Sequence, residues 1–142
     1  MSKPPKLIKL SSPDEYKKYY INKYCKKPIK TFDGIEVKFY EERFEHAFYE
    51  STDKLNASKD VFSVDRATRI DWIEYVLQNP NAELHAGWDK KKKKVDRTRR
   101  VAFITPENYV VIIMITGLNK AKFVTAYYAD NSAKKIRANP LW

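Results

Sequence analysis

The alternation of hydrophobic and polar residues is clearest in the last third of the chain, where three apolar runs follow one another. The runs are residues 101–104, 109–115 and 123–128, and all are rich in β-branched and aromatic side chains. Each run is bounded by turn residues, so the pattern predicts three strands joined as a meander. The middle run is apolar at successive positions, which indicates a central strand that is covered on both faces.

The register of the two turns decides which side chains of this meander share a face, because side chains alternate along a strand. If both turns preserve parity, Thr125 and Tyr127 lie on the same face as Arg99. Arg100 then lies on the opposite face, together with Ala126.

Elsewhere the pattern predicts helices, and the helix starts carry recognisable caps. Ser12 precedes a proline and two acidic residues, which is typical of a helix N-terminus. Helices are predicted at residues 13–25, 41–50, 64–78 and 130–138, and short extended segments at 35–39 and 82–88. We therefore predict an α+β fold in which N-terminal helices pack on a C-terminal antiparallel sheet of about four strands. Residues 1–12 are predicted to form a flexible arm and residues 13–142 a single domain.

The predicted helix 64–78 has an unusual apolar face. Arg66 and Arg69 extend the arc that carries Ile70, Ile73 and Leu77. A buried stripe that continues into two arginines leads either to a cleft that binds an anion or to buried ion pairs. The periodicity does not decide between these two interpretations.

The overall charge points to a polyanionic partner. The formal net charge is +10, the pI is about 9.6 and aromatic residues make up 14% of the chain. Cationic and aromatic side chains together suit nucleic acid, which offers phosphates and stackable bases. The simpler alternative is a basic protein whose charge serves solubility. Five consecutive lysines at positions 90–94 are typical of a solvated loop that would attract a polyanion.

Several other classes of function find no support in the sequence. Cys25 is the single cysteine, and the start of the chain has no apolar run of signal-peptide length. The longest apolar run is too short to span a bilayer, so a cytoplasmic protein without membrane contact is expected. Two histidines and one cysteine do not make a metal site, and three glycines argue against a nucleotide-cradling loop. No cofactor is therefore expected.

His46 is a candidate acid or base. A histidine is the side chain whose unperturbed pKa lies nearest neutrality. Helical periodicity, however, places it opposite the apolar stripe of helix 41–50 and next to Arg43, as a solvated histidine would be. The other histidine, His85, falls in the predicted segment 82–88 with less context.

The order of these segments resembles a known family. RFEHAFYES and DRATRIDWIEYVLQNP on helices, followed by RRVAFITPENYVVII and KFVTAYYAD on a sheet, are similar to phage-associated ribonucleases of the barnase, EndoU, colicin and RelE superfamily. The resemblance spans about three quarters of the chain. It implies a metal-independent endoribonuclease, phage-borne or toxin-like, with tRNA as one candidate substrate and an acidic immunity or antitoxin protein as a candidate partner.

The resemblance also implies roles for individual residues. The helical histidine would be His46, the basic pair that opens a strand would be Arg99 and Arg100, and the hydroxyl positions would be Thr125 and Tyr127. The resemblance does not decide between the two arginines; Arg100 is taken as catalytic with His46 and Thr125, and Arg99 and Tyr127 as RNA-binding. Independently of the resemblance, Arg66 and Arg69 on the helical arc and Arg97 before the strand are expected to contact RNA phosphates. The reaction would be attack of a 2'-hydroxyl on the adjacent phosphate, with arginines in place of a metal ion. Two alternatives stay open, namely a nucleic-acid-binding phage protein without catalysis and a basic module that binds an acidic protein.

Overall fold

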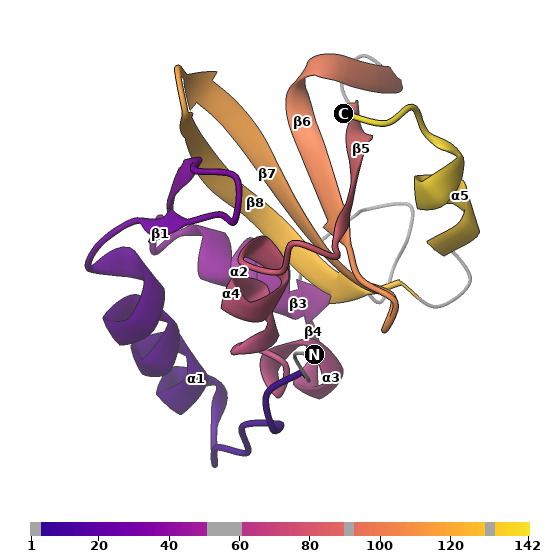
Figure 1. Ribbon diagram of the computed structural model, residues 1–142. Coiled ribbons are helices and arrows are strands. Elements are labelled where there is room, and N and C mark those ends of the chain that lie inside the picture. The colour runs from indigo at the N-terminus through magenta and orange to yellow at the C-terminus, as the bar shows by residue number, and fades with distance from the viewer. Residues whose placement is uncertain (1–3, 51–60, 90–92, 130–132) are drawn as a thin grey trace.

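The computed structural model describes residues 4–50, 61–89, 93–129 and 133–142, and it has the α+β class predicted from the sequence (Figure 1). Its main sheet has six strands in the order β1-β2-β8-β7-β6-β5. The predicted three-stranded meander forms one part of it, as β6 (Lys94–Ile104), β7 (Tyr109–Gly117) and β8 (Lys120–Tyr128). The extended segment predicted at 82–88 is β5 (Glu83–Asp89), which pairs with β6. β7 lies in the interior of this sheet, as its apolar sequence predicts.

The prediction of about four antiparallel strands was wrong, because two short strands extend the sheet beyond β8. β1 (Ile29–Lys30) pairs with β2 (Glu36–Lys38), and β2 pairs with β8 in parallel orientation. The predicted extended segment 35–39 contains β2, but the two-residue strand β1 carries no alternation, and the pairing of β2 with β8 cannot be read from a local pattern. A separate pair of strands, β3 (Tyr49–Glu50) and β4 (Val61–Phe62), lies outside the main sheet. The predicted helix 41–50 is correspondingly shorter, as α2 (Arg43–Phe48).

The first predicted helix is present, but it changes its winding. α1 (Pro13–Tyr20) begins at Ser12, whose side chain accepts a hydrogen bond from the Glu15 N–H, and it continues as the π-helix η1 (Ile21–Cys25). The last helix, α5, spans Ala133–Ala138, and the preceding residues of the predicted helix 130–138 lie outside the described residues.

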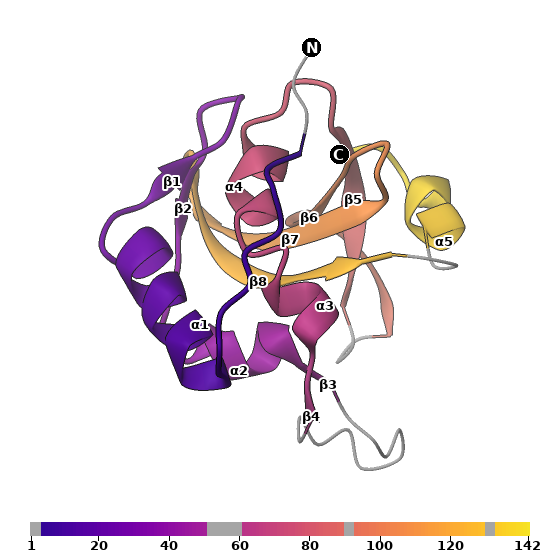
Figure 2. The ribbon, with the colours of Figure 1, turned by 90° about the horizontal axis from the view of Figure 1, so that it is seen from below.

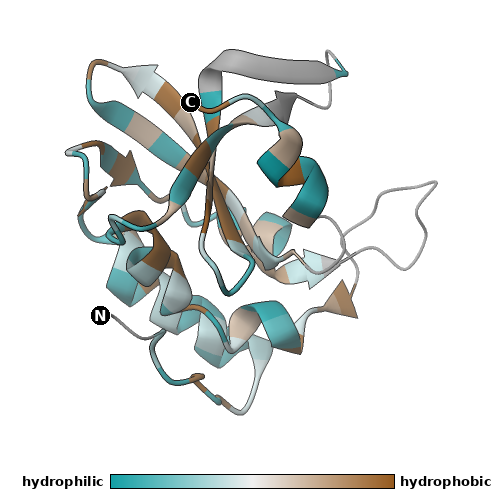
Figure 3. Ribbon diagram, turned by 45° about the vertical axis from the view of Figure 1, so that its right-hand side comes forward, coloured by the Kyte–Doolittle hydropathy of each residue, from teal (hydrophilic) through white to brown (hydrophobic). Residues whose placement is uncertain are grey.

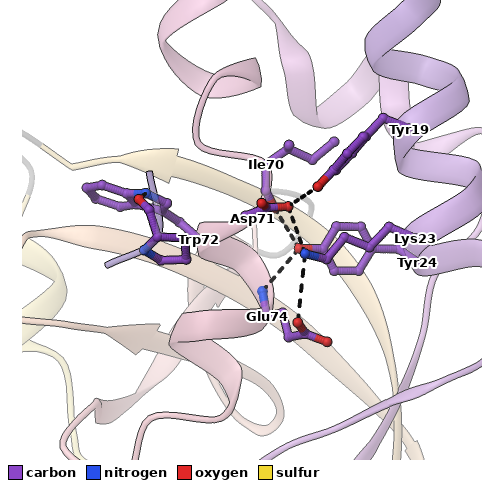
Figure 4. A network of polar contacts seen from close by, with 8 residues as sticks. Tyr19, Lys23, Tyr24, Ile70, Asp71, Trp72 and Glu74 are labelled. Carbon is purple, nitrogen blue, oxygen red and sulfur yellow. Dashed lines mark hydrogen bonds and ion pairs between the residues drawn. The ribbon is translucent and has the colours of Figure 1, made fainter. Parts of the chain in front are cut away.

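The prediction of one continuous helix over residues 64–78 was wrong. The segment forms two short helices, α3 (Val64–Ala67) and α4 (Trp72–Leu77). The hydroxyl of Tyr24 donates to the carbonyl of Ile70 at 2.6 Å and accepts from the N–H of Glu74 at 3.2 Å. These two backbone groups would bond each other in a continuous helix, so the inserted hydroxyl explains the break (Figure 4).

Further hydrogen bonds beside Tyr24 attach the N-terminal segment of the chain to α4. Asp71 accepts hydrogen bonds from the Tyr19 hydroxyl at 2.6 Å and from the Lys23 ammonium at 2.7 Å. Trp72 donates its indole N–H to the carbonyl of Pro5, so part of the predicted N-terminal arm lies against α4 (Figure 4).

The two faces of the main sheet are covered by different helices, as the two ribbon views show (Figures 1 and 2). α1 to α4 pack on one face, here named the helical face, where Val101, Phe103, Val111, Ile113 and Phe123 join the larger core. α5 packs on the opposite face, here named the α5 face, where Ala102, Ile104 and Val110 meet Ile136. No helix among the described residues is long and apolar enough to cross a membrane.

Candidate functional site

A β-bulge in β8 reverses the predicted alternation of side chains. Ile113 pairs with Phe123, whereas the adjacent Ile112 pairs with Thr125, so Val124 is an extra residue in β8. Beyond Val124, Thr125 and Tyr127 therefore point to the α5 face, and Ala126 belongs to the core of the helical face. The expectation that parity is preserved was wrong, because an extra residue shifts the alternation by one.

This shift brings Thr125 to the same face as Arg100. Arg100 pairs with Met114 and lies two residues before Ala102 on the α5 face. α5 does not cover this end of the α5 face completely, and it leaves an open patch that we define by six half-buried or exposed residues. The open patch consists of Lys38, Arg100, Ile112, Met114, Lys122 and Thr125. Figure 3 brings α5 to the front and shows hydrophilic and hydrophobic segments alternating along the β7–β8 hairpin.

Arg100 is held closely and carries an unused donor. The Nε atom of Arg100 is buried and has no hydrogen-bond partner among the described residues. A buried donor without a partner costs about 1–3 kcal/mol, so an arriving oxyanion would remove an existing penalty. The backbone of β5 passes directly beside this residue, because a Cβ atom added at Gly87 would lie 2.8 Å from the Cβ of Arg100. Gly87 therefore permits the approach of the two strands at this point.

Arg43 brings a second guanidinium group to the edge of β8. Its Nε and Nη2 donate to the carbonyl oxygen of Val124 at 3.0 and 2.6 Å. Burial lowers the pKa of Arg43, the neighbouring Tyr20 raises it, and the positive charge of Arg100 lowers it further. Within the described part of the chain neither Arg43 nor Arg100 is in an ion pair with a carboxylate. Two neighbouring guanidinium groups without a carboxylate partner favour the binding of an anionic ligand.

His46 lies on the same side of α2 as Arg43, because residues three positions apart are neighbours on a helix. Arg43 contacts β8, and His46 is half-buried. Arg43 and His46 are three positions apart on α2, and the open patch begins on the adjacent strand β8. The structure thus brings Arg100 and Thr125 to one face, whereas His46 lies on α2, which packs on the helical face and contacts β8 through Arg43.

Arg66 reaches Tyr127 from α3. Its Nη1 donates to the carbonyl of Ala47 at 3.2 Å, and its Cζ lies 5.6 Å from the centre of the Tyr127 ring. Burial raises the pKa of the Tyr127 hydroxyl, and the positive charge of Arg66 opposes that rise. This cation–π pair lies farther along β8 than Thr125, at the border of the open patch.

Arg69 lies on the helical face, away from the open patch. Its Cζ lies 5.2 Å from the ring centres of both Trp72 and Tyr128, and its Nη1 donates to the carbonyl of Asp65. Tyr128 follows Tyr127 and points to the helical face, so Arg69 is separated from Arg100 by the sheet. Arg97 and Arg99 belong to β6, but their side chains are not among those that the structure describes.

The lysines of the open patch were not predicted from the sequence, nor were Arg43, Ile112 and Met114. Lys38 in β2 is the direct partner of Lys122 in β8. The residues immediately before them, Val37 and Ala121, are buried in the core of the helical face. Because side chains alternate along a strand, both lysines point to the α5 face. The only signal in the sequence was the alternation of lysine with apolar residues in KAKF and EVKF. The parallel pairing of β2 with β8 joins these segments, and it could not be read from either one alone.

His85 is buried, and both of its ring nitrogens lie within hydrogen-bond distance of protein groups. The side chain is only 3% exposed, its Nδ1 lies 2.9 Å from the carbonyl of Asn139, and its Nε2 lies 3.2 Å from the carboxylate of Glu83. Glu83 also accepts a hydrogen bond from Arg137 in α5. The hydrogen bonds from His85 and Arg137 lower the pKa of Glu83. His85 therefore helps to hold the C-terminal segment against β5.

The described residues hold no group of three or more histidine, cysteine, aspartate or glutamate side chains that could bind a metal ion. No protein-family model, no curated protein and no solved structure matches this chain.

Proposed function

We propose that the protein is a metal-independent endoribonuclease whose active site is the open patch together with His46 and Arg43 at its edge. The observation that carries this proposal is the bulge at Val124, which puts Thr125 on the face of Arg100. The resemblance to the barnase, EndoU, colicin and RelE superfamily names the same two residues and His46. The net charge of +10 is consistent with an RNA substrate, and tRNA is one candidate.

The proposed reaction begins with the attack of a ribose 2'-oxygen on the adjacent phosphorus. A new phosphorus–oxygen bond forms, the bond to the 5'-oxygen breaks, and a 2',3'-cyclic phosphate remains on one product. One proton leaves the 2'-hydroxyl and one is delivered to the departing 5'-oxygen. His46 carries one of these transfers and solvent water serves the other.

Arginine supplies the electrostatic stabilisation in this proposal. Negative charge accumulates on the non-bridging phosphate oxygens in the transition state, and the unpartnered Nε of Arg100 is a donor for one of them. Arg43 adds a second positive charge near Arg100 while it stays bonded to the Val124 carbonyl. Thr125 donates its hydroxyl hydrogen to the phosphate, and Tyr127 orients a neighbouring base.

The direct test is to incubate the purified protein with total RNA in EDTA and to map the product ends. The proposal expects cleavage that persists in EDTA and leaves cyclic phosphate ends. The matched control is Arg100→Gln, which keeps much of the side-chain volume but removes the guanidinium charge. Intact RNA under all conditions, or cleavage by Arg100→Gln at the wild-type rate, would contradict the proposed active site.

A second candidate function is nucleic-acid binding without catalysis. It is favoured by the lysines of the open patch, Lys38 and Lys122, which add phosphate contacts but no acid or base. Retention of RNA by the protein with no cleavage in either EDTA or magnesium would favour this candidate. A third candidate, a basic module for an acidic protein partner, would be favoured by salt-sensitive binding to that protein and not to RNA.

A further inference from the structure

A pocket adjoins the open patch where the parallel strands β2 and β8 meet. Its volume is about 220 Å³, and β2, β7, β8, Pro28 before β1 and the segment before α2 contribute to its walls. It is lined chiefly by Glu36, Lys38, Tyr40, Thr116, Lys120 and Lys122, and we name it the lysine pocket. None of these six residues was assigned a role by the sequence analysis.

The lysine pocket has an excess of positive charge. Glu36 is the register partner of Lys120, which offsets one lysine, but Lys38 is the register partner of Lys122. Like charges directly opposite each other on neighbouring strands destabilise a sheet. Among the residues that the structure describes, no carboxylate lies within ion-pair distance of Lys38 or Lys122. An anion bound between them would relieve this repulsion.

Tyr40 supplies an aromatic surface to the same pocket. The residue is 40% exposed, and the Nζ of Lys38 lies 5.2 Å from the centre of its ring. Its backbone is fixed, because the carbonyl of Tyr40 accepts a hydrogen bond from the buried hydroxyl of Tyr20 at 2.8 Å. A partly exposed ring on a fixed backbone, with cations beside it, is the combination that binds an unpaired base and its phosphate.

The lysine pocket is aligned with the proposed active site. Lys38, Lys122, Met114 and Arg100 are successive register partners across four neighbouring strands. Three strand spacings of about 4.8 Å give a row about 14 Å long. This row, in which Met114 lies between Arg100 and the two lysines, therefore leads across the sheet from the lysine pocket to Arg100.

We propose that the lysine pocket binds an unpaired nucleotide of single-stranded RNA, next to the phosphate held by Arg100. Lys38 and Lys122 contact the phosphate of this nucleotide, and its base stacks on Tyr40. This inference rests on the proposed function and specifies its substrate class. A double helix does not fit, because its bases are stacked on one another and cannot lie on the Tyr40 ring.

The test measures binding of a fluorescently labelled single-stranded RNA and of the corresponding RNA duplex by anisotropy over a series of salt concentrations. The double variant Lys38→Gln/Lys122→Gln is compared with Lys9→Gln/Lys18→Gln, which removes the same charge at exposed positions of the N-terminal segment and α1. Each phosphate that is neutralised on a single strand contributes about 0.7 to the salt slope, so the pocket variant, which loses its contact with one phosphate, should lower the slope by about 0.7. The control variant should change it much less.

Replacement of Tyr40 tests the stacking. Tyr40→Phe keeps the ring and should retain single-strand affinity, whereas Tyr40→Leu should weaken it about tenfold and leave duplex affinity unchanged. If both lysine variants lower the slope equally, or if Tyr40→Leu matches Tyr40→Phe, the lysine pocket is not a nucleotide site even when the wild type cleaves RNA. If the wild type binds no RNA, the proposed function itself fails. Tighter binding of duplex than of single strand by the wild type would overturn the substrate class.

Discussion

The guanidinium group of Arg43 donates two hydrogen bonds to one acceptor, the backbone carbonyl of Val124, at 3.0 and 2.6 Å. Val124 is the extra residue of the bulge in β8, and a bulged residue lacks its regular partner in the ladder. Arg43 therefore links α2 to the irregularity that directs Thr125 toward Arg100. The helix that carries His46 and the strand that carries Thr125 are fixed to each other by one side chain.

Arg43→Leu should lower both stability and function. The substitution leaves the half-buried carbonyl of Val124 without its donor, and a hydrogen bond from a charged group contributes about 1.5–3 kcal/mol. We expect the free energy of unfolding in urea to fall by about 2 kcal/mol. RNA cleavage should fall more than stability accounts for under conditions where the variant is folded.

Arg43→Lys is the matched control for that substitution. It keeps a positive charge but cannot donate two hydrogen bonds from a planar group. It should lie between the wild type and Arg43→Leu in unfolding free energy. Equal stability of all three proteins would show that the Arg43–Val124 contact is not formed in solution.

Gly87→Ala should displace Arg100. A Cβ atom at Gly87 would lie 2.8 Å from the Cβ of Arg100, so the two strands must separate to accept it. We expect loss of thermal stability and, in the folded fraction, lower RNA affinity. Gly117→Ala is the matched control, because a Cβ there has nothing within 4 Å. The close approach is refuted if the melting temperatures of the two variants do not differ.

The contact between α1 and α4 should appear as a pH dependence of stability. Burial, followed by the hydrogen bond to Asp71, raises the pKa of Tyr19 to about 12 (Figure 4). The unfolded value is near 10, so the folded protein holds this proton more tightly above pH 10. The contribution of Tyr19 is therefore complete below about pH 10 and is lost as the pH rises toward about 12.

Urea unfolding at a series of alkaline pH values measures this effect. Tyr19→Phe should lose less stability than the wild type over that pH range, whereas Tyr40→Phe, at an exposed position, should follow the wild type. Parallel pH profiles for the wild type and Tyr19→Phe would mean that Tyr19 titrates with an ordinary pKa.

The local patterns in the sequence predicted the meander and most helix starts because both depend on short-range chemistry. Asn108 and Asn119 have φ values of 65° and 54°, as expected of residues that close tight turns. Ser12 and Ser63 accept hydrogen bonds from the backbone three residues later. These features need no knowledge of distant parts of the chain.

The features that were missed all depend on contacts between distant segments. Tyr24 interrupts a helix nearly 50 residues away, and β2 joins β8 across more than 80 residues. The bulge at Val124 had the largest consequence, because no local pattern distinguishes KFVTAYY with a bulge from the same strand without one. The sequence could therefore name Arg99 and Arg100 as candidates, but only the bulge shows that Arg100 shares a face with Thr125.

His46→Ala should abolish most cleavage while RNA binding stays nearly intact. In the proposed reaction, His46 acts on protons that move only as the transition state forms, so its loss affects kcat much more than affinity. A positioned acid or base contributes about 100-fold to 10,000-fold. Thr125→Val should show the same separation of kcat from affinity, and Thr125→Ser, which keeps the hydroxyl, should retain activity. Arg100→Ala differs from both, because it should weaken binding as well as cleavage.

The control for these variants is Arg69→Ala, which changes an arginine on the helical face. It should lower thermal stability, through lost packing on Trp72 and Tyr128, and leave cleavage by the folded protein unchanged. Single-turnover kinetics on a labelled single-stranded RNA in EDTA compare the four site variants and Arg69→Ala under the same conditions. Wild-type cleavage by His46→Ala would mean that His46 is a solvated residue at the edge of β8, and the proton transfer could then not be assigned to it.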